Sequence, residues 1–215
     1  MIDHKHKAII EHYEACLARH GDTNLGVDWP NNADAEKRYL VMLEVVREPD
    51  VNLTLLDFGC GASHLYPYLQ RSRFAGLEYH GLDASPAFCA LSREKYPQND
   101  YVCLDVIAEP EKFGEFDYVV MNGVFTEKRD LTFEEMFEYF KQVMRIVFPK
   151  VRRGLAFNVM SKAVDWERAD LFHLPTDPLI SFMADELSRH FIIRNDYGLY
   201  EYTVYLYKEP YPCLR

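Results

Sequence analysis

An apolar segment that ends in a glycine-spaced turn carries the first chemical signal of this sequence. Residues 55–63 read Leu-Leu-Asp-Phe-Gly-Cys-Gly-Ala-Ser, so Asp57 closes an apolar run, and Gly59 and Gly61 lead into the next element. Glycine adopts the unusual dihedral angles of such a turn and lets backbone N–H groups approach a ligand closely. The segment predicts a nucleotide-cofactor loop between a strand and a helix.

A second acidic residue narrows the kind of cofactor. Asp83 stands roughly 20 residues further on, where a carboxylate at the end of the next strand accepts hydrogen bonds from ribose hydroxyls. His64 occupies the position where a dinucleotide fingerprint needs its third glycine, and Asp57 would repel phosphates. Both departures argue against an NAD-dependent oxidoreductase. They favour a cofactor with an ammonium group and no phosphate, a charge pattern that S-adenosylmethionine has.

Four segments, in order, resemble the class I S-adenosylmethionine-dependent methyltransferases. Residues 55–61 resemble their motif I, 81–85 their ribose-binding strand end, 101–106 the segment that meets the adenine amino group, and 116–125 the strand leading to the methyl-transfer centre. Turn chemistry alone is the alternative for the Asp and Asn-Gly positions. The cofactor contacts expected from the residues and the resemblance are Asp57, Gly59, Gly61, Asp83, Ala84, Asp105, Val106, Asn122 and Phe125.

The amino-terminal part resembles small bacterial methyltransferases of this type. Residues 26–29 read Gly-Val-Asp-Trp and precede a helix, expected to begin near Asp34, that carries Arg38. The resemblance implies that Trp29 covers the cofactor and that Arg38 pairs with its methionine carboxylate, a charge-assisted contact. From the sequence alone, an arginine at the position of Arg38 is more often an exposed helix charge. His4, His6 and His12 lie on a polar first helix and are expected to be solvated.

The densest cluster of acidic, basic and aromatic residues is segment 165–173, Asp-Trp-Glu-Arg-Ala-Asp-Leu-Phe-His. Methyl transfer to a hydroxyl benefits from a base that takes the proton, and histidine suits this role near neutral pH. His173 is the first catalytic candidate, with Asp170 beside it. The alternative is that both only anchor the segment. Asp165, Asp170 and His173 lack a recognisable ligand spacing, so no metal site is predicted.

Composition bounds the class of protein. The 215 residues, 48% of them apolar, suit a single domain, and the formal charge of −10 argues against a nucleic-acid partner. The five cysteines form no paired motif, which favours a reducing compartment. The amino terminus lacks the apolar core of a secretion signal, and no run is long enough to span a membrane. We expect a cytoplasmic protein and leave a homodimer open.

Strand and helix signals alternate from residue 52, which predicts an α/β fold. Ser85 with Pro86 and the capping box that begins at Thr132 mark helix starts, and segments 191–194 and 202–207 predict an antiparallel hairpin. We expect a Rossmann-like, three-layer α/β/α sandwich around a seven-stranded, mostly parallel sheet whose last hairpin is antiparallel. Its parts are a helical lid (1–50), a cofactor-binding half (51–160), a substrate-wall insertion (161–176), and the last helix and hairpin (177–215).

The expected activity is transfer of a methyl group from S-adenosylmethionine to a small-molecule acceptor. A hydroxyl of a sugar, polysaccharide precursor or secondary metabolite is the first choice. An amine or carboxylate acceptor is the first alternative. A non-catalytic cofactor-binding or regulatory module on the same fold is the second.

Overall fold

A seven-stranded sheet forms the centre of the computed structural model, which describes residues 5–29, 31–48 and 52–212. The strand order is β3-β2-β1-β4-β5-β7-β6. Strand β7 runs antiparallel to β5 and β6, whereas the other neighbours pair in parallel. The predicted sheet is therefore confirmed. Its strands are β1 (Thr54–Phe58), β2 (Glu78–Asp83), β3 (Asp100–Cys103), β4 (Phe116–Met121), β5 (Val151–Met160), β6 (His190–Arg194) and β7 (Glu201–Tyr207).

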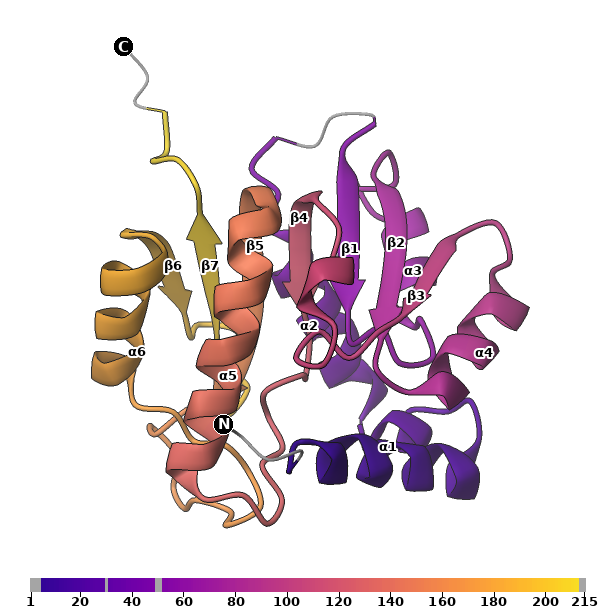
Figure 1. Cartoon of the computed structure of the whole chain (residues 1–215), viewed down its shortest axis with the longest axis horizontal. Helices are drawn as coiled ribbons and strands as arrows, with labels where there is room; N and C mark the ends of the chain where they lie inside the picture. The colour runs from indigo at the N-terminus through magenta and orange to yellow at the C-terminus, as the bar shows by residue number, and fades with distance from the viewer. Residues whose placement is uncertain (1–4, 30, 49–51, 213–215) are drawn as a thin grey trace.

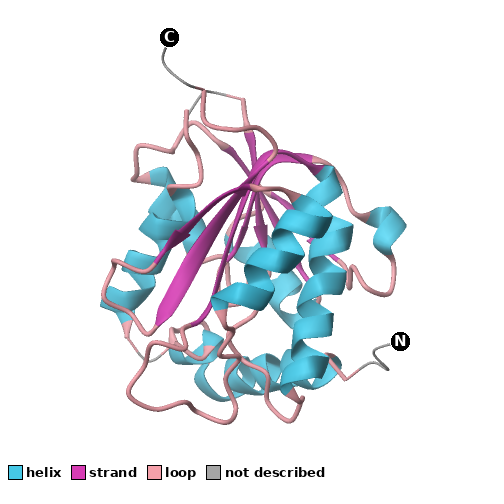
Figure 2. Cartoon of the chain, turned by 90° about the vertical axis from the view of Figure 1, so that its left-hand side faces the viewer, coloured by secondary structure: helices cyan, strands magenta, loops and turns pink. Residues whose placement is uncertain are grey.

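Helices cover both faces of the sheet, as Figure 2 shows. One apolar core lies between the sheet and α5 and α6, and a second lies between the sheet and α2 and α3. The expected three-layer sandwich is confirmed. The longer helices are α1 (Lys7–His20), α2 (Asn32–Leu43), α3 (Leu65–Gln70), α4 (Pro86–Lys95), α5 (Phe133–Val147) and α6 (Thr176–Phe182). The short ones are η1 (Leu25–Val27), η2 (Pro110–Lys112), η3 (Phe148–Lys150) and the π-helical η4 (Met183–Leu187).

Local capping explains where two of these helices begin. The Ser85 hydroxyl accepts a hydrogen bond from the N–H of Phe88, and Pro86 occupies the first turn of α4. Thr132 and Glu135 form a reciprocal capping box at the start of α5. Both predicted helix starts are confirmed. The caps fix the directions in which α4 and α5 leave the loops that follow β2 and β4.

The carboxyl ends of the parallel strands are covered by segments from outside the sheet. Helix α1 lies across this edge, below β1 and β2 in Figure 1. Segment 161–174 returns to the same edge through bridges that pair Met160 with His173 and Glu127 with Leu171. Ligands of open α/β sheets bind at this edge, so α1 and segment 161–174 stand where a lid and a wall would.

The described part of the chain offers no membrane-crossing helix. In residues 5–29, 31–48 and 52–212, none combines sufficient length with sufficient apolar character.

Candidate functional site

Two cavities open at the carboxyl edge of the sheet. The first cavity is bounded by α1, by the loop after β1, and by the ends of β2, β3 and β4. The second cavity is bounded by the segment around Asp28, by the loop after β4, by segment 164–173 and by the start of β7. Trp29 and Gly123 border both cavities. Two ligands bound there would meet at these two residues.

The loop after β1 owes its shape to glycine. Gly59 and Gly61 have φ angles of +71° and +52°, a region that side chains disfavour. A Cβ on Gly59 would lie 2.7 Å from Cγ2 of Val124. The N–H of Gly61 donates to Oδ2 of Asp83 over 2.8 Å. The loop therefore joins the ends of β1 and β2 and lines the first cavity with backbone.

Two carboxyl groups, Asp57 and Asp83, lie in the wall of the first cavity. Asp57 accepts a hydrogen bond from the Tyr79 hydroxyl over 2.8 Å, but burial raises the pKa of this carboxyl to about 7. Burial also raises the pKa of Asp83. The N–H groups of Ser85 and Gly61 stabilise its ionised form and offset part of this rise. A ligand with an ammonium group and hydroxyls would stabilise the ionised form of both carboxyl groups.

Asn122 places a buried side-chain amide at the first cavity. Its side-chain oxygen and nitrogen are both buried, and neither has a hydrogen-bond partner among the described residues. A buried amide in that state costs free energy until something pairs with it. Asn122 borders the first cavity, as do Ala84 and Val106. These observations fit a polar ligand in this cavity.

His6 departs from its expected solvation. It is buried, its Nε2 lies 3.0 Å from Oδ2 of Asp105, and its ring stacks on Tyr139 at 5.2 Å. All three residues border the first cavity. His12 is half-buried, with Nε2 2.8 Å from Oδ2 of Asp28, and His4 lies outside the described residues. The helix is amphipathic, and His6 continues the inward-facing stripe of Ile9, Ile10 and Tyr13 at helical spacing.

Arg38 differs from its expected pairing with the cofactor. Its guanidinium binds both oxygens of Glu201, with Nε at 3.0 and 2.9 Å, and it borders the second cavity, not the first. The reason is that the Glu201 carboxylate is buried and needs a cation. Glu201 also accepts from the Asn158 amide over 3.0 Å. Asn158 in turn accepts from the N–H of Gly123 over 2.8 Å, so Arg38 helps to position the loop after β4.

Trp29 was expected to cover the cofactor, and it borders the first cavity, against the loop after β4. A Cβ on Gly123 would lie 3.3 Å from Cζ2 of Trp29. The Arg38 guanidinium is 5.2 Å from the centre of the Trp29 ring. The indole is therefore held between α2 and the loop, at the junction of the two cavities.

Phe125 is a core residue and does not border the first cavity. Its ring meets Phe140 at 4.9 Å and Tyr139 at 6.1 Å, both edge to face. The positive φ of Gly123 turns the chain after β4, and Phe125 then points into the core beneath α5. Its predicted contact with the cofactor does not occur in this arrangement.

His173 borders the second cavity in a tautomer that suits a base. Its Nδ1 donates to the carbonyl oxygen of Ser161 over 2.7 Å, which leaves Nε2 as an acceptor. The N–H of Arg168 approaches Nε2 at 3.3 Å, a long contact. Nε2 therefore already accepts a long hydrogen bond, which an acceptor hydroxyl in the second cavity would have to displace.

Asp170 does not stand beside His173 in the second cavity. Its carboxylate pairs with Arg168 and lies 3.9 Å from Arg129, and Arg168 holds the pKa of Asp170 below its usual range. Its carbonyl oxygen accepts from the N–H groups of Lys128 and Arg129. Asp170 therefore anchors segment 161–174, because two cations and two N–H groups meet it away from the cavity.

Sequence reasoning did not identify three polar residues that border the two cavities, namely His6, Asn158 and Glu201. Asn158 sits inside a strand that reads as an apolar run, where a polar residue could have marked it, whereas Glu201 is the first residue of β7, one position before the predicted strand. His6 could have been found from the spacing of its helix. Of the predicted contacts, the first cavity brings together Trp29, Asp57, Gly59, Gly61, Asp83, Ala84, Asp105, Val106 and Asn122.

Comparison with known sequences finds a family model that matches the middle of the chain. A family model described as a methyltransferase domain matches residues 56–149. "Putative methyltransferase Rv1506c" from Mycobacterium tuberculosis (strain ATCC 25618 / H37Rv) is 29% identical over 157 residues, which cover 71% of this chain and 91% of the relative. The matched domain spans the loops after β1, β2, β3 and β4 that form the first cavity.

Solved structures share the fold at low sequence identity. Magnesium protoporphyrin IX methyltransferase (ChlM) from Synechocystis PCC 6803, solved with bound SAM, superposes with a TM-score of 0.65 at 15% identity, covering 94% of this chain and 97% of that one. The [4+2]-cyclase SpnF superposes with a TM-score of 0.58 at 16% identity, covering 86% and 73%. The fold is confirmed, and it carries more than one reaction among these neighbours.

Proposed function

We propose that this chain, a class I S-adenosylmethionine-dependent methyltransferase, methylates a hydroxyl group of a small molecule held in the second cavity. The observation that carries the proposal is the junction of the two cavities at Trp29 and Gly123, with the acceptor nitrogen of His173 in the second. Donor and acceptor would meet there with little water between them.

The first cavity fits the donor. Asp83 would accept hydrogen bonds from the ribose hydroxyls, and Asp105 with His6 would meet the adenine. Asp57 would attract the ammonium group, directly or through the loop, and the unpartnered amide of Asn122 would find a partner. When bound, S-adenosylmethionine supplies an electrophilic methyl group on sulfonium sulfur.

His173 would take the proton. As the acceptor oxygen forms its bond to the methyl carbon, the carbon–sulfur bond breaks, and the hydroxyl proton passes to Nε2 of His173. The Ser161 carbonyl holds Nδ1 as the donor, and the hydroxyl would displace the long contact between Nε2 and the N–H of Arg168. General-base assistance of this kind contributes roughly 10²–10⁴-fold in rate.

An amine is the second candidate acceptor, because the second cavity is acidic. Five carboxyl groups border it, from Asp28, Asp34, Glu127, Asp165 and Glu201, against two guanidinium groups, from Arg38 and Arg168. Burial and the neighbouring Asp28 raise the pKa of Glu127, as expected where negative charges gather. A cationic acceptor would be attracted to this wall, as would a hydroxyl-rich one that donates hydrogen bonds to it.

We propose a small-molecule acceptor and a cytoplasmic location from the second cavity, the net charge and the free cysteines. The acceptor is a small molecule because the second cavity is a bounded pocket, and the net charge of −10 disfavours nucleic acid. Cys16, Cys60, Cys89 and Cys103 are free thiols, in keeping with the cytoplasm. A homodimer is left open, and sedimentation would decide it.

The test separates donor binding from transfer. We expect calorimetry to detect binding of S-adenosylmethionine and S-adenosylhomocysteine by the unaltered chain, weakened by Asp83→Asn and unchanged by the exposed control Asp185→Asn. Labelled donor offered with hydroxyl-bearing and amine-bearing small molecules would then identify the acceptor. His173→Gln should slow hydroxyl methylation and leave donor affinity unchanged. Binding of neither ligand would overturn the enzyme assignment, whereas binding with equal rates in both proteins would exclude His173 as the base.

A further inference from the structure

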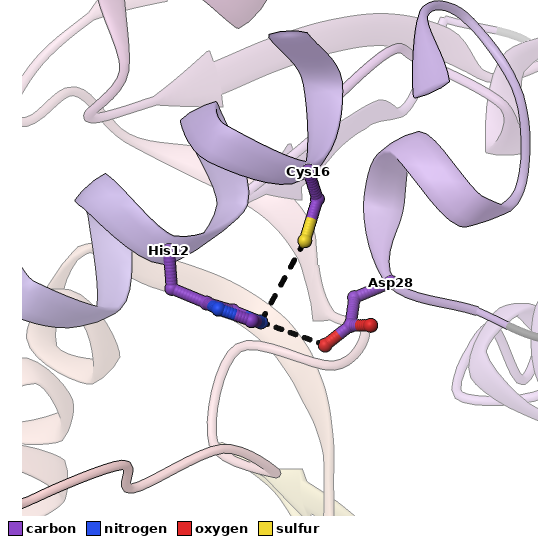
Figure 3. A group of neighbouring side chains, drawn as sticks. All are labelled: His12, Cys16 and Asp28. Carbon is purple, nitrogen blue, oxygen red and sulfur yellow. Dashed lines mark hydrogen bonds and ion pairs between the residues drawn. The ribbon is translucent and has the colours of Figure 1, made fainter. Parts of the chain in front are cut away.

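Three side chains with metal-binding atoms converge beside the lid. His12 and Cys16 stand one helical turn apart on α1, and Asp28 follows η1, as Figure 3 shows. Their ligand atoms all lie within 4.8 Å of one another. Nε2 of His12 is 2.8 Å from Oδ2 of Asp28 and 3.8 Å from Sγ of Cys16. These distances are close to those between the ligands of one ion.

The arrangement does not fit a catalytic triad. In a triad, one ring nitrogen of the histidine serves the nucleophile and the other serves the carboxylate. Here the thiol and the carboxylate both approach Nε2 of His12. The approach of both groups to the same nitrogen instead suits three ligand atoms that surround one metal ion.

We propose that His12, Cys16 and Asp28 bind a zinc ion that joins α1 to the turn before Trp29. Thiolate, imidazole and carboxylate together suit Zn²⁺ better than Mg²⁺ or Ca²⁺, which prefer oxygen. Tetrahedral zinc holds such ligand atoms roughly 3.3–3.6 Å apart, so the Asp28 carboxylate moves outward by ~0.5 Å. Water completes the fourth position, as at zinc sites with three protein ligands.

Charge and backbone geometry agree with this ion. Zn²⁺ with one thiolate, one carboxylate and one neutral imidazole is neutral overall, which suits the buried Cys16. Cys16 binds as thiolate and releases its proton to solvent. Asp28 has the left-handed φ of 57°, a conformation that aspartate adopts more readily than most non-glycine residues. Asp28 also borders the second cavity, so the ion would fix one of its walls.

Cobalt(II) reports on this site without any assay of activity, because thiolate coordination to cobalt gives a charge-transfer absorption. The purified full chain should bind one equivalent of Co²⁺ with this absorption, and Zn²⁺ should displace it. Cys16→Ala should abolish the absorption. Asp28→Asn, at a partly exposed position, should weaken cobalt binding about tenfold or more while the chain stays folded.

Two variants serve as matched controls. Cys103→Ser removes an exposed thiol, and His80→Ala disrupts the cluster of Glu78, His80 and Asp100, which has no sulfur. Both should keep the absorption. The proposal is overturned if the unaltered chain shows no thiolate absorption, if the band survives in Cys16→Ala, or if Asp28→Asn binds cobalt as tightly as the unaltered chain. Donor binding by calorimetry is independent of all three outcomes.

Discussion

The His6 imidazole and the Asp105 carboxylate meet at 3.0 Å in the wall of the first cavity. His6 precedes α1, whereas Asp105 follows β3, so the contact joins the lid to the edge of the sheet. The hydrogen bond from His6 is the main reason that the pKa of Asp105 is held below its usual range. The pair that joins α1 to the sheet edge therefore includes the carboxyl group that we propose meets the adenine.

His6→Ala is expected to weaken donor binding. The substitution removes a hydrogen bond to a charged group and the ring that stacks on Tyr139, so we expect about tenfold lower affinity for S-adenosylmethionine. Calorimetry on the variant and on His20→Ala, an exposed position on the same helix, provides the comparison. Equal affinity in all three proteins would show that the pair plays no part in donor binding.

The affinity for the donor is expected to depend on pH through Asp57. Its pKa is raised to about 7 by burial, and the ammonium group of the donor favours the ionised form. Affinity should therefore rise about fivefold from pH 6 to pH 7 as the carboxyl loses its proton. Calorimetry at both values tests this, and Asp57→Asn should bind more weakly at pH 7 with a flat profile. A rise of the same size in Asp57→Asn would assign the titration to another group.

The Asp57 carboxyl group should also make the free energy of unfolding of the ligand-free chain depend on pH. In the unfolded chain an aspartate titrates near ~4, so between that pH and about 7 the folded chain holds a proton that the unfolded chain has released. The contribution of Asp57 to the free energy of unfolding therefore decreases as the pH rises through this window. Urea denaturation at pH 5 and pH 8 should show a smaller decrease in Asp57→Asn than in the unaltered chain.

Arg38→Ala is expected to destabilise the fold because it leaves a buried charge without its cation. The Glu201 side chain is 2% exposed, and Arg38 is its bidentate partner. We expect a loss of ~3 kcal/mol in the free energy of unfolding. Arg38→Ala combined with Glu201→Gln should recover much of it, since the neutral amide tolerates burial. Urea denaturation of the single and double variants checks this, and additive losses would show that the two side chains are not coupled.

The sequence predicted the elements and the first cavity because these depend on local or regularly spaced signals. Glycines at fixed positions after β1 and an acidic residue at the end of β2 mark the turns at the carboxyl edge of the sheet. The network of Arg38, Glu201 and Asn158 depends on contacts between residues 38, 158 and 201, and no spacing rule links them. Arg38 was expected at the cofactor from the resemblance, and no local pattern revealed that the partner of its charge lies 163 residues away.

Phe125 and Asp170 illustrate a second limit. Whether a side chain after a turn points to the cavity or to the core depends on the φ angles of the turn, and Gly123 adopts +82°. The turn places Phe125 under α5, where its ring packs against Phe140. Similarly, Asp170 has the residue type of a catalytic partner, but Arg168 lies two residues away and captures its carboxylate.

Gly59→Ala tests how strictly the loop after β1 requires glycine. The new methyl would lie 2.7 Å from Cγ2 of Val124, and the backbone would keep a φ of +71° that alanine disfavours. We expect the free energy of unfolding to fall by ~2–3 kcal/mol. Gly114→Ala is the matched control, since its nearest contact would be an ordinary 3.6 Å to Phe116.

Adding Val124→Ala separates the two causes. This second substitution removes the clashing methyl group and leaves the φ angle unchanged, so the double variant should regain the part of the loss that comes from contact alone. The remaining deficit, about 1 kcal/mol, measures the strain of a left-handed alanine. If Gly59→Ala proved as stable as Gly114→Ala in urea denaturation, the loop would be able to adopt another path, and its N–H groups would not be fixed for the cofactor before binding.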